Sequence, residues 1–422
     1  LRIPVLLAGM ALIPAVYLLA KRLYGTVTAL IAASLTAATP ILVYYSVTAR
    51  GYMLVALFTV LTLILNLYLI HHKNLFAWLA WIIITVLGFY TLPIMFYPFG
   101  IMITWMLILG STGDLSIQYQ KMRGLLKYLL VASICAGVLT IICYSPILLK
   151  NGILNFFNGA TVVNSLSLGA FISSFPTKLG ETLDNWRFRT PRAVETILIA
   201  GLFLSPFIHP GSTKPRTSLQ SAALLFLSLI LLAQRPNSMP RIWLWLLPLC
   251  LIFSAAGFVG LFQRLFASRI TQPFIKTSLA ALTVLLILGS SLWYGWQISP
   301  KPGQPYGGRE VEQITRYLKD IVTPDDVIVP SSFSNAPLWY YARLLGIPNP
   351  IYRSIKSRPS YRAYVIVYPD IGDTVEKVIL ENGPDLVFYN LKTVTLVFTS
   401  QNAQVYRVDA FPEVVNKAYG IK

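Results

Sequence analysis

The sequence predicts an α-helical polytopic membrane domain of about ten spans, followed by a small soluble α/β domain. Two observations carry this fold class. Long apolar segments succeed one another through residues 1–300, whereas residues 309–422 are polar and alternate between helical and strand-like patterns. Carboxylates are also nearly absent from residues 1–300, as expected where side chains face lipid rather than water. The acidic residues there are Asp114, Glu181, Asp184 and Glu195.

The apolar segments have the length that a bilayer requires. A spanning helix needs about 20 mostly apolar residues, and most of the segments meet or approach that number. We therefore predict a transmembrane domain over residues 1–298, with a long outer loop at 149–191. The predicted spans are 3–20, 26–45, 51–70, 76–92, 94–110, 126–148, 192–209, 217–234, 241–262 and 276–297.

Composition and charge agree with a membrane protein. Hydrophobic residues make up 55% of the chain and charged residues 12%, against about 25% charged in a typical soluble domain. Nearly all of the net charge of +18 belongs to residues 1–300. Its Lys and Arg residues are spread over loops rather than clustered on a soluble surface. The charge therefore indicates positive-inside topology and contact with anionic membrane lipid, not a nucleic acid partner.

The distribution of cations between loops predicts the orientation. If residue 1 starts outside and each segment crosses once, the short inner loops hold more Lys and Arg than the short outer ones. Ten crossings then place the tail on the same outer face as residue 1 and the loop 149–191. The inner cations are Lys21, Arg22, Lys73, Lys121, Arg123, Lys127, Lys214, Arg216, Arg264, Arg269 and Lys276.

The sequence contains no pattern that calls for a metal or a cofactor. The three cysteines all fall inside apolar spans, where a small buried side chain is the common role. The histidines lie at predicted inner helix ends with no carboxylate or cysteine nearby. The cysteines are Cys135, Cys143 and Cys250, and the histidines are His71, His72 and His209. We expect neither a metal site nor a cofactor.

The beginning of the chain also predicts something about the parent protein. Leu1-Arg2-Ile3-Pro4 opens directly into a span, with no initiator Met and no signal peptide pattern before it. We expect a segment upstream of this chain that matters for function.

The tail reads as a separate domain behind a linker. Residues 299–308 are rich in Pro and Gly, which marks a boundary. The region 309–422 alternates between helices and strands, which predicts a small extracytoplasmic α/β sheet domain. It has no glycine-rich phosphate motif and no Ser/His/Asp set, so a cap or a partner-contact domain is the expected role. We expect helices at 309–321, 335–345 and 373–382, and strands at 327–329, 363–368, 385–389, 393–399 and 404–408.

One group of residues on the predicted outer face suits an anion. Spans two and three meet at a tight break that contains Arg50, with Tyr44, Tyr45 and Tyr52 around it. An interfacial aromatic belt with a snorkelling arginine would give the same pattern. A guanidinium among phenol hydroxyls also offers bidentate donors to a lipid phosphate, and it does not lose its proton.

Further cations fall on the same predicted face. Arg187 and Arg189 follow Trp186 in the long outer loop, and Arg241 opens span nine after Pro240. A sugar-bearing phospholipid would need cations for its phosphate and an aromatic face such as Trp186 for its sugar ring. We predict Arg50 and Arg241 as phosphate ligands, Tyr45 and Tyr52 as hydrogen-bonding neighbours, and Arg187 and Arg189 as weaker candidates.

Several short patterns along the chain belong together. They are Arg2-Ile3-Pro4, Lys21-Arg22-Leu23-Tyr24-Gly25, Tyr45-Ser46-x-x-Ala49-Arg50-x-Tyr52, Phe89-Tyr90-Thr91-Leu92-Pro93, Pro240-Arg241 with Leu247-Pro248, and Pro324-Asp325-Asp326-Val327-Ile328. With these patterns the chain resembles glycosyltransferase family 39, which includes protein mannosyltransferases and the lipid A aminoarabinose transferase, within the C superfamily of membrane glycosyltransferases. The similarity covers most of the chain but depends on short patterns and overall layout.

The resemblance implies the function. It implies a polyprenyl-phosphate-linked sugar as donor, an acceptor of unknown kind, and transfer on the outer face of a bacterial plasma membrane. Inverting transfer needs a carboxylate to take the acceptor's proton. In the family that residue lies in the first outer loop, which we expect upstream of Leu1. Glu181 and Asp184 are weak substitutes, since carboxylates beside Arg187 are more often ion pairs.

One departure from the family pattern keeps other functions open. The bacterial pattern before the arginine reads Gln-Glu-Ala-Arg, whereas this chain has Val47-Thr48-Ala49-Arg50. The loss of that Glu, with no catalytic acid in the chain, leaves a non-catalytic scaffold for envelope polysaccharide assembly as an alternative. A transporter or lipid flippase is the other alternative, although the sequence shows neither internal repeats nor mid-membrane charge.

Overall fold

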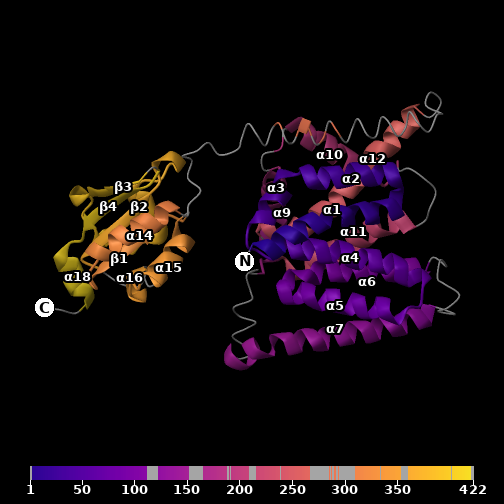
Figure 1. Cartoon of the computed structure of the whole chain (residues 1–422), viewed down its shortest axis with the longest axis horizontal. Helices are drawn as coiled ribbons and strands as arrows, with labels where there is room; N and C mark the ends of the chain where they lie inside the picture. Colours follow the sequence, from indigo (N-terminus) through magenta and orange to yellow (C-terminus); the bar gives the residue numbers. More distant parts are fainter. Residues whose placement is uncertain are drawn as a thin grey trace. The chain divides into compact units, whose positions relative to one another are not determined.

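The computed structural model divides the chain into two compact units, Leu1–Gln297 and Ile298–Lys422. Figure 1 shows the first as a bundle of helices and the second as a small sheet with helices. The residues that the structure describes are 2–111, 122–151, 165–187, 190, 192–208, 215–237, 239–266, 285, 287, 289–290, 293, 309–332, 334–352, 360–400 and 402–419. The predicted linker 299–308 lies outside these residues.

The first unit consists of helices, as the apolar segments predict. In chain order they are α1 (Ile3–Tyr24), α2 (Thr26–Ala38), α3 (Pro40–Val47), α4 (Tyr52–His71), α5 (Leu75–Thr91), η1 (Pro93–Met95), α6 (Phe96–Ser111), α7 (Met122–Asn151), α9 (Leu168–Trp186), α10 (Arg192–Leu204), α11 (Pro215–Gln234), η3 (Pro240–Leu246) and α12 (Leu247–Phe266).

The described helices support a membrane domain but not yet a count of ten spans. Among the described residues, five helices are long and apolar enough to cross a bilayer, and the bent pair of α2 and α3 makes a sixth. Three shorter apolar helices lie at Leu75–Thr91, Val194–Leu204 and Leu219–Gln234. Most of the predicted span 276–297 lies outside the described residues. The number ten therefore stays a prediction.

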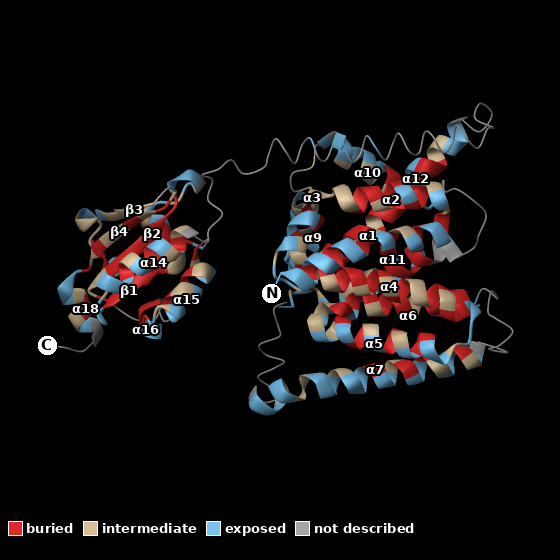
Figure 2. Ribbon diagram, in the orientation of Figure 1, coloured by how far each residue is buried: buried red, intermediate tan, exposed pale blue. Residues whose placement is uncertain are grey.

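Exposure identifies surfaces that suit hydrocarbon. Figure 2 shows α7 exposed along most of its length. Its exposed side chains include Leu130, Val131 and Ile134. A solvated helix would place polar residues on such a face, so this pattern is the one expected for a helix that contacts lipid.

Two parts of the first unit differ from the sequence prediction. The predicted span 26–45 is not one straight helix, because α2 and α3 meet at a bend of 57°. Pro40 begins α3 and has no backbone N–H, which breaks the hydrogen-bond ladder after Thr39. The predicted loop 149–191 contains helix α9, which begins where the Ser167 side chain accepts a hydrogen bond from the N–H of Ala170.

The tail forms a four-stranded sheet of order β1-β2-β4-β3. Strand β1 is parallel to β2, and the other two pairs are antiparallel. Alternate residues such as Ile328 and Val329 point into two separate apolar clusters, one on each face of the sheet. The elements are α14 (Arg309–Ile321), β1 (Asp326–Pro330), α15 (Asn335–Leu344), α16 (Asn349–Tyr352), β2 (Arg362–Val367), η5 (Pro369–Ile371), α17 (Val375–Asn382), η6 (Leu386–Phe388), η7 (Leu391–Thr393), β3 (Thr395–Thr399), β4 (Gln404–Asp409) and α18 (Pro412–Tyr419).

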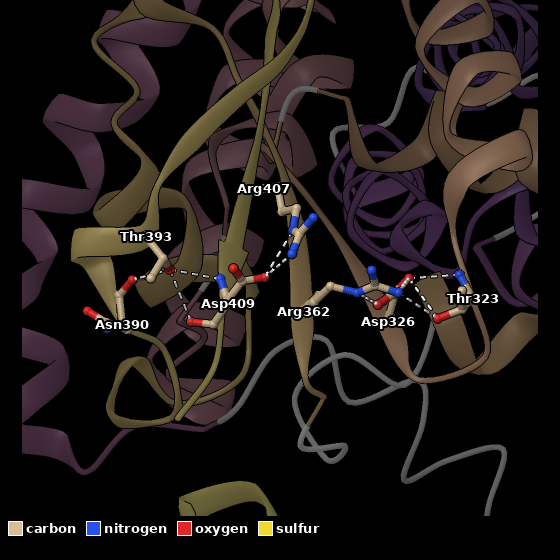
Figure 3. Close-up of polar contacts among 7 residues, drawn as sticks. All are labelled: Thr323, Asp326, Arg362, Asn390, Thr393, Arg407 and Asp409. Atoms are coloured by element: carbon tan, nitrogen blue, oxygen red, sulfur yellow. Dashed lines mark hydrogen bonds and ion pairs between the residues drawn. The ribbon is translucent and has the colours of Figure 1, made fainter. Parts of the chain in front are cut away.

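A buried ion pair connects the start of the tail's sheet to its second strand. The carboxylate of Asp326 is fully buried and accepts hydrogen bonds from Thr323 and from Arg362, whose Nε lies at 2.7 Å (Figure 3). The hydrogen bond to Asp326 raises the pKa of the Arg362 guanidinium. In the same view Asp409 of β4 binds Arg407 and the Thr393 hydroxyl. These bonds lie at the end of the sheet where β1 and β2 begin and β4 ends, and they hold the three strands together there.

One strand prediction in the tail is wrong. The segment 385–389 forms the short 3-10 helix η6 (Leu386–Phe388) instead of a strand. The side chain of Asp385 accepts a hydrogen bond from the N–H of Val387, and this local turn competes with extended pairing. The helices predicted at 309–321, 335–345 and 373–382 are confirmed, each to within two residues at either end.

Candidate functional site

The predicted site residues that the structure describes lie toward one end of the first unit. Figure 1 shows α3, α9 and the N-terminus at the same end of the helices, and α3 packs on α1. Helix η3 packs on α9 and on α4, and the Leu166 N–H donates to the Arg235 carbonyl just before η3. We call this end, with the turn 48–51, α9 and Arg241, the Arg50 face.

The turn 48–51 determines the position of Arg50. Helix α3 ends at Val47, and Thr48 is extended. The N–H of Arg50 donates to the Thr48 carbonyl at 2.7 Å. A Cβ on Gly51 would lie 2.5 Å from Cγ2 of Thr91, so a residue with a side chain does not fit between this turn and the end of α5. Arg50 itself is exposed at this turn.

Two tyrosines from the neighbouring helices pack next to this turn. Tyr45 of α3 is 5% exposed, and its ring lies edge-on to the ring of Tyr52 of α4, with centroids 5.6 Å apart. Tyr44 is exposed, and its ring centroid lies 5.4 Å from that of Tyr45. Edge-to-face packing of this kind holds phenol rings in fixed orientations.

The structure brings Arg241 to the same tyrosine. Both Arg50 and Arg241 act electrostatically on the hydroxyl of Tyr45. Neither guanidinium forms an ion pair with any carboxylate among the described residues. Two uncompensated cations beside phenol hydroxyls are a favourable environment for a phosphate. We call Arg50, Arg241, Tyr45 and Tyr52 the arginine–tyrosine cluster.

Arg187 has different neighbours. It follows α9 and lies between two carboxylates, at 2.7 Å from Asp184 and 3.5 Å from Glu195. Arg187 is therefore charge-compensated, unlike Arg50 and Arg241. The other candidate in this loop, Arg189, lies outside the described residues.

The two weak candidates for a general base lie in surface ion pairs. Glu181 pairs with Lys178 at 3.0 Å, and the Asp184 side chain is 63% exposed in its pair with Arg187. Exposed pairs of this kind contribute about 0–1 kcal/mol to stability. Both carboxylates therefore face solvent and are held by a neighbouring cation.

An apolar cavity of about 210 Å³ lies beside Arg187. It extends from the bend between α2 and α3 to α10 and α12, which approach closely because Gly201 has no side chain: a Cβ there would lie 2.5 Å from the Ser254 carbonyl. Glu195 and Thr190 also line this cavity. No motif in the sequence predicts a site at these two residues, since only the start of α10 at Arg192 brings Glu195 back to Arg187.

The described residues contain no group of three or more His, Cys, Asp or Glu side chains that could hold a metal ion. The described residues of the Arg50 face offer guanidinium, phenol, indole, hydroxyl and carboxylate groups. Such groups bind phosphates and sugars through hydrogen bonds and charge.

Comparison with solved structures identifies the fold. ArnT from Cupriavidus metallidurans, crystallised in the apo state, aligns with a TM-score of 0.52 and 11% identity over 96% of this chain and 83% of its own. The oligosaccharyltransferase of Archaeoglobus fulgidus, AglB, aligns with a TM-score of 0.46 and 12% identity over 95% of this chain and 60% of its own. No family model and no curated protein matches the sequence.

The alignment with ArnT confirms the predicted resemblance at the level of the fold. The match in fold extends over most of both chains. A helical membrane domain followed by a small domain with a mixed sheet is the architecture that the sequence predicts. Fold alone does not assign an activity, which depends on the residues at the site.

Proposed function

We propose that the protein is a membrane glycosyltransferase that moves a sugar from a polyprenyl-phosphate carrier to an acceptor on the outer face of a bacterial plasma membrane. The observation that carries the proposal is the arginine–tyrosine cluster, in which two guanidinium groups without a carboxylate partner among the described residues both act electrostatically on the buried Tyr45. The ArnT-like fold supports a glycosyltransferase in general. In this proposal the tail lies on the same outer face.

The charge that develops during transfer explains why two arginines would be needed. The bond between the anomeric carbon and the phosphate oxygen breaks, and its electron pair stays on the phosphate. The acceptor oxygen forms the new bond to that carbon and gives its proton to a general base. The leaving phosphate gains negative charge as this happens. Arg50 and Arg241 would stabilise that charge, since fixed donors act most strongly where charge appears in the transition state.

Arg50→Ala tests the proposal. The full-length protein in lipid nanodiscs is titrated with tritium-labelled polyprenyl phosphate, and transfer is followed as loss of label from the corresponding sugar-bearing carrier. We expect about 100-fold weaker binding and loss of transfer, because a charged hydrogen-bonding group to the phosphate disappears. Arg50→Lys should also lose transfer, because an ammonium does not reproduce the planar fork.

A matched control separates the site from general effects of charge. Arg264 is an exposed arginine near the end of α12 remote from η3, so Arg264→Ala removes the same side chain elsewhere in the unit. This control should bind polyprenyl phosphate and transfer sugar as the unaltered protein does. Equal binding and transfer by Arg50→Ala and Arg264→Ala, at equal expression, would overturn the proposal.

A further inference from the structure

The cavity beside Arg187 has walls that suit a hydrocarbon chain. Leu183, Leu198, Leu202, Leu247 and Leu251 line it, and its volume is about 210 Å³. For comparison, an apolar protein cavity of about 150 Å³ holds a molecule of benzene. An alkyl segment of an amphiphile therefore fits here without displacing helices.

The polar end of this cavity does not favour an anion. Arg187 already binds Asp184 at 2.7 Å and lies 3.5 Å from Glu195. These three side chains carry one positive and two negative charges, so the local sum is −1. A phosphate placed there would meet two carboxylates whose attraction for Arg187 it would have to replace.

Two donors at this end are buried without a hydrogen-bond partner among the described residues. They are Nε1 of Trp186 and Oγ1 of Thr190, and both residues line the cavity. An indole N–H can only donate, whereas a threonine hydroxyl donates and accepts. Buried groups of this kind are ordinarily satisfied. A ligand hydroxyl could accept from Trp186, and another could donate to the carboxylate of Glu195.

From the apolar walls, the charge balance and the unpartnered donors, we propose that the cavity binds an amphiphile with an uncharged, hydroxyl-rich headgroup, of the glycolipid class. Its alkyl chain occupies the apolar part, and its hydroxyls bind Trp186, Thr190 and Glu195. The inference deepens the proposed function, and depends on it in one respect: the bound glycolipid is the acceptor of the transferred sugar.

The binding can be measured by contact quenching of tryptophan fluorescence. The full chain in phosphatidylcholine nanodiscs is titrated with a glucosyl diacylglycerol whose acyl chains are dibrominated, and in parallel with dibrominated phosphatidic acid. We expect saturable quenching by the glucosyl lipid and weaker, unsaturated quenching by the anionic lipid. Trp186→Phe should remove the saturable component, whereas Trp339→Phe in the tail should leave it unchanged.

A second pair of variants keeps the fold intact and tests the hydroxyl contact. Thr190→Val removes the unpartnered hydroxyl and preserves side-chain shape, and we expect about five-fold weaker binding of the glucosyl lipid. Thr196→Val is the control, because the Thr196 hydroxyl is exposed and donates to the Arg192 carbonyl instead. Equal affinities for these two variants, or stronger quenching by phosphatidic acid, would overturn the inference.

The outcomes distinguish this inference from the proposed function. If Arg50→Ala weakens polyprenyl phosphate binding but the glucosyl lipid does not bind saturably, the acceptor site fails and the proposed function stands. If the glucosyl lipid binds as described while Arg50→Ala has no effect on polyprenyl phosphate or on transfer, the proposed function fails. The assignment of this lipid as an acceptor then fails with it.

Discussion

The arginine–tyrosine cluster and the cavity beside Arg187 lie at the same end of the same helical unit, yet their arginines have opposite surroundings. Arg50 and Arg241 share a tyrosine and have no carboxylate partner among the described residues. Arg187 is paired with Asp184 and lies next to Glu195. An arginine therefore marks an anion site only when its charge is uncompensated, and residue type alone does not identify its ligand.

The largest expected difference between the two regions is in affinity for polyprenyl phosphate. Arg241→Ala should weaken binding about 100-fold, as Arg50→Ala does, because an uncompensated cation is lost. Arg187→Ala should weaken it less than about threefold, because its charge is already neutralised by the two carboxylates. Equilibrium binding to the three variants in nanodiscs checks this. Similar losses for Arg187→Ala and Arg241→Ala would erase the distinction.

The position of the turn 48–51 should affect binding of polyprenyl phosphate almost as much as the charge of Arg50 does. Gly51→Ala places a Cβ 2.5 Å from Cγ2 of Thr91, and we expect about ten-fold weaker binding of polyprenyl phosphate because the turn must shift. The glucosyl lipid should bind Gly51→Ala normally. Thr91→Ala in the same chain removes the clashing methyl and should restore most of the affinity.

Gly137 offers a control for that substitution, since a Cβ there meets nothing within 4 Å. Gly137→Ala should leave the affinities for both probes unchanged. If the double variant Gly51→Ala with Thr91→Ala binds polyprenyl phosphate no better than Gly51→Ala alone, the close approach is not what positions Arg50.

A single carboxylate should set the ligand preference of the cavity. Glu195→Gln keeps the side-chain shape and changes the local sum of charge from −1 to zero. In the quenching titration we expect the affinity for dibrominated phosphatidic acid to rise about five-fold and the affinity for the glucosyl lipid to fall about threefold. The ratio of the two affinities is the measured quantity. The same ratio in Glu195→Gln and in the unaltered protein would show that Glu195 does not face the headgroup.

The smallest expected effect is a difference in sensitivity to salt. Raising NaCl from about 0.05 to about 0.5 M should weaken polyprenyl phosphate binding several-fold, because screening reduces attraction between exposed charges. Binding of the uncharged glucosyl lipid should change by less than about twofold. Parallel titrations with both probes at each salt concentration check this, and equal salt dependence would mean that both regions bind through charge.

The sequence predicted the elements better than the contacts between them. Apolar length and the scarcity of carboxylates predict helices in the first unit, and alternation predicts the tail's sheet. The prediction of a strand at 385–389 is wrong because the Asp385 side chain accepts a hydrogen bond from the Val387 N–H and forms a local turn. The segment 149–191 stays a predicted outer loop, and the structure adds that Ser167 begins helix α9 within it.

What the sequence determined by itself is the solvent of each part of the chain, since this follows from local composition and from the number of apolar residues in each segment. The membrane face on which its arginines gather stays a prediction. Only the tertiary structure decided which arginine is compensated. Asp184 reaches Arg187 from within α9, but Glu195 does so only because α10 begins on the same face. Electrostatic compensation depends on distances of a few ångströms between separate helices, and no pattern along the chain encodes such distances.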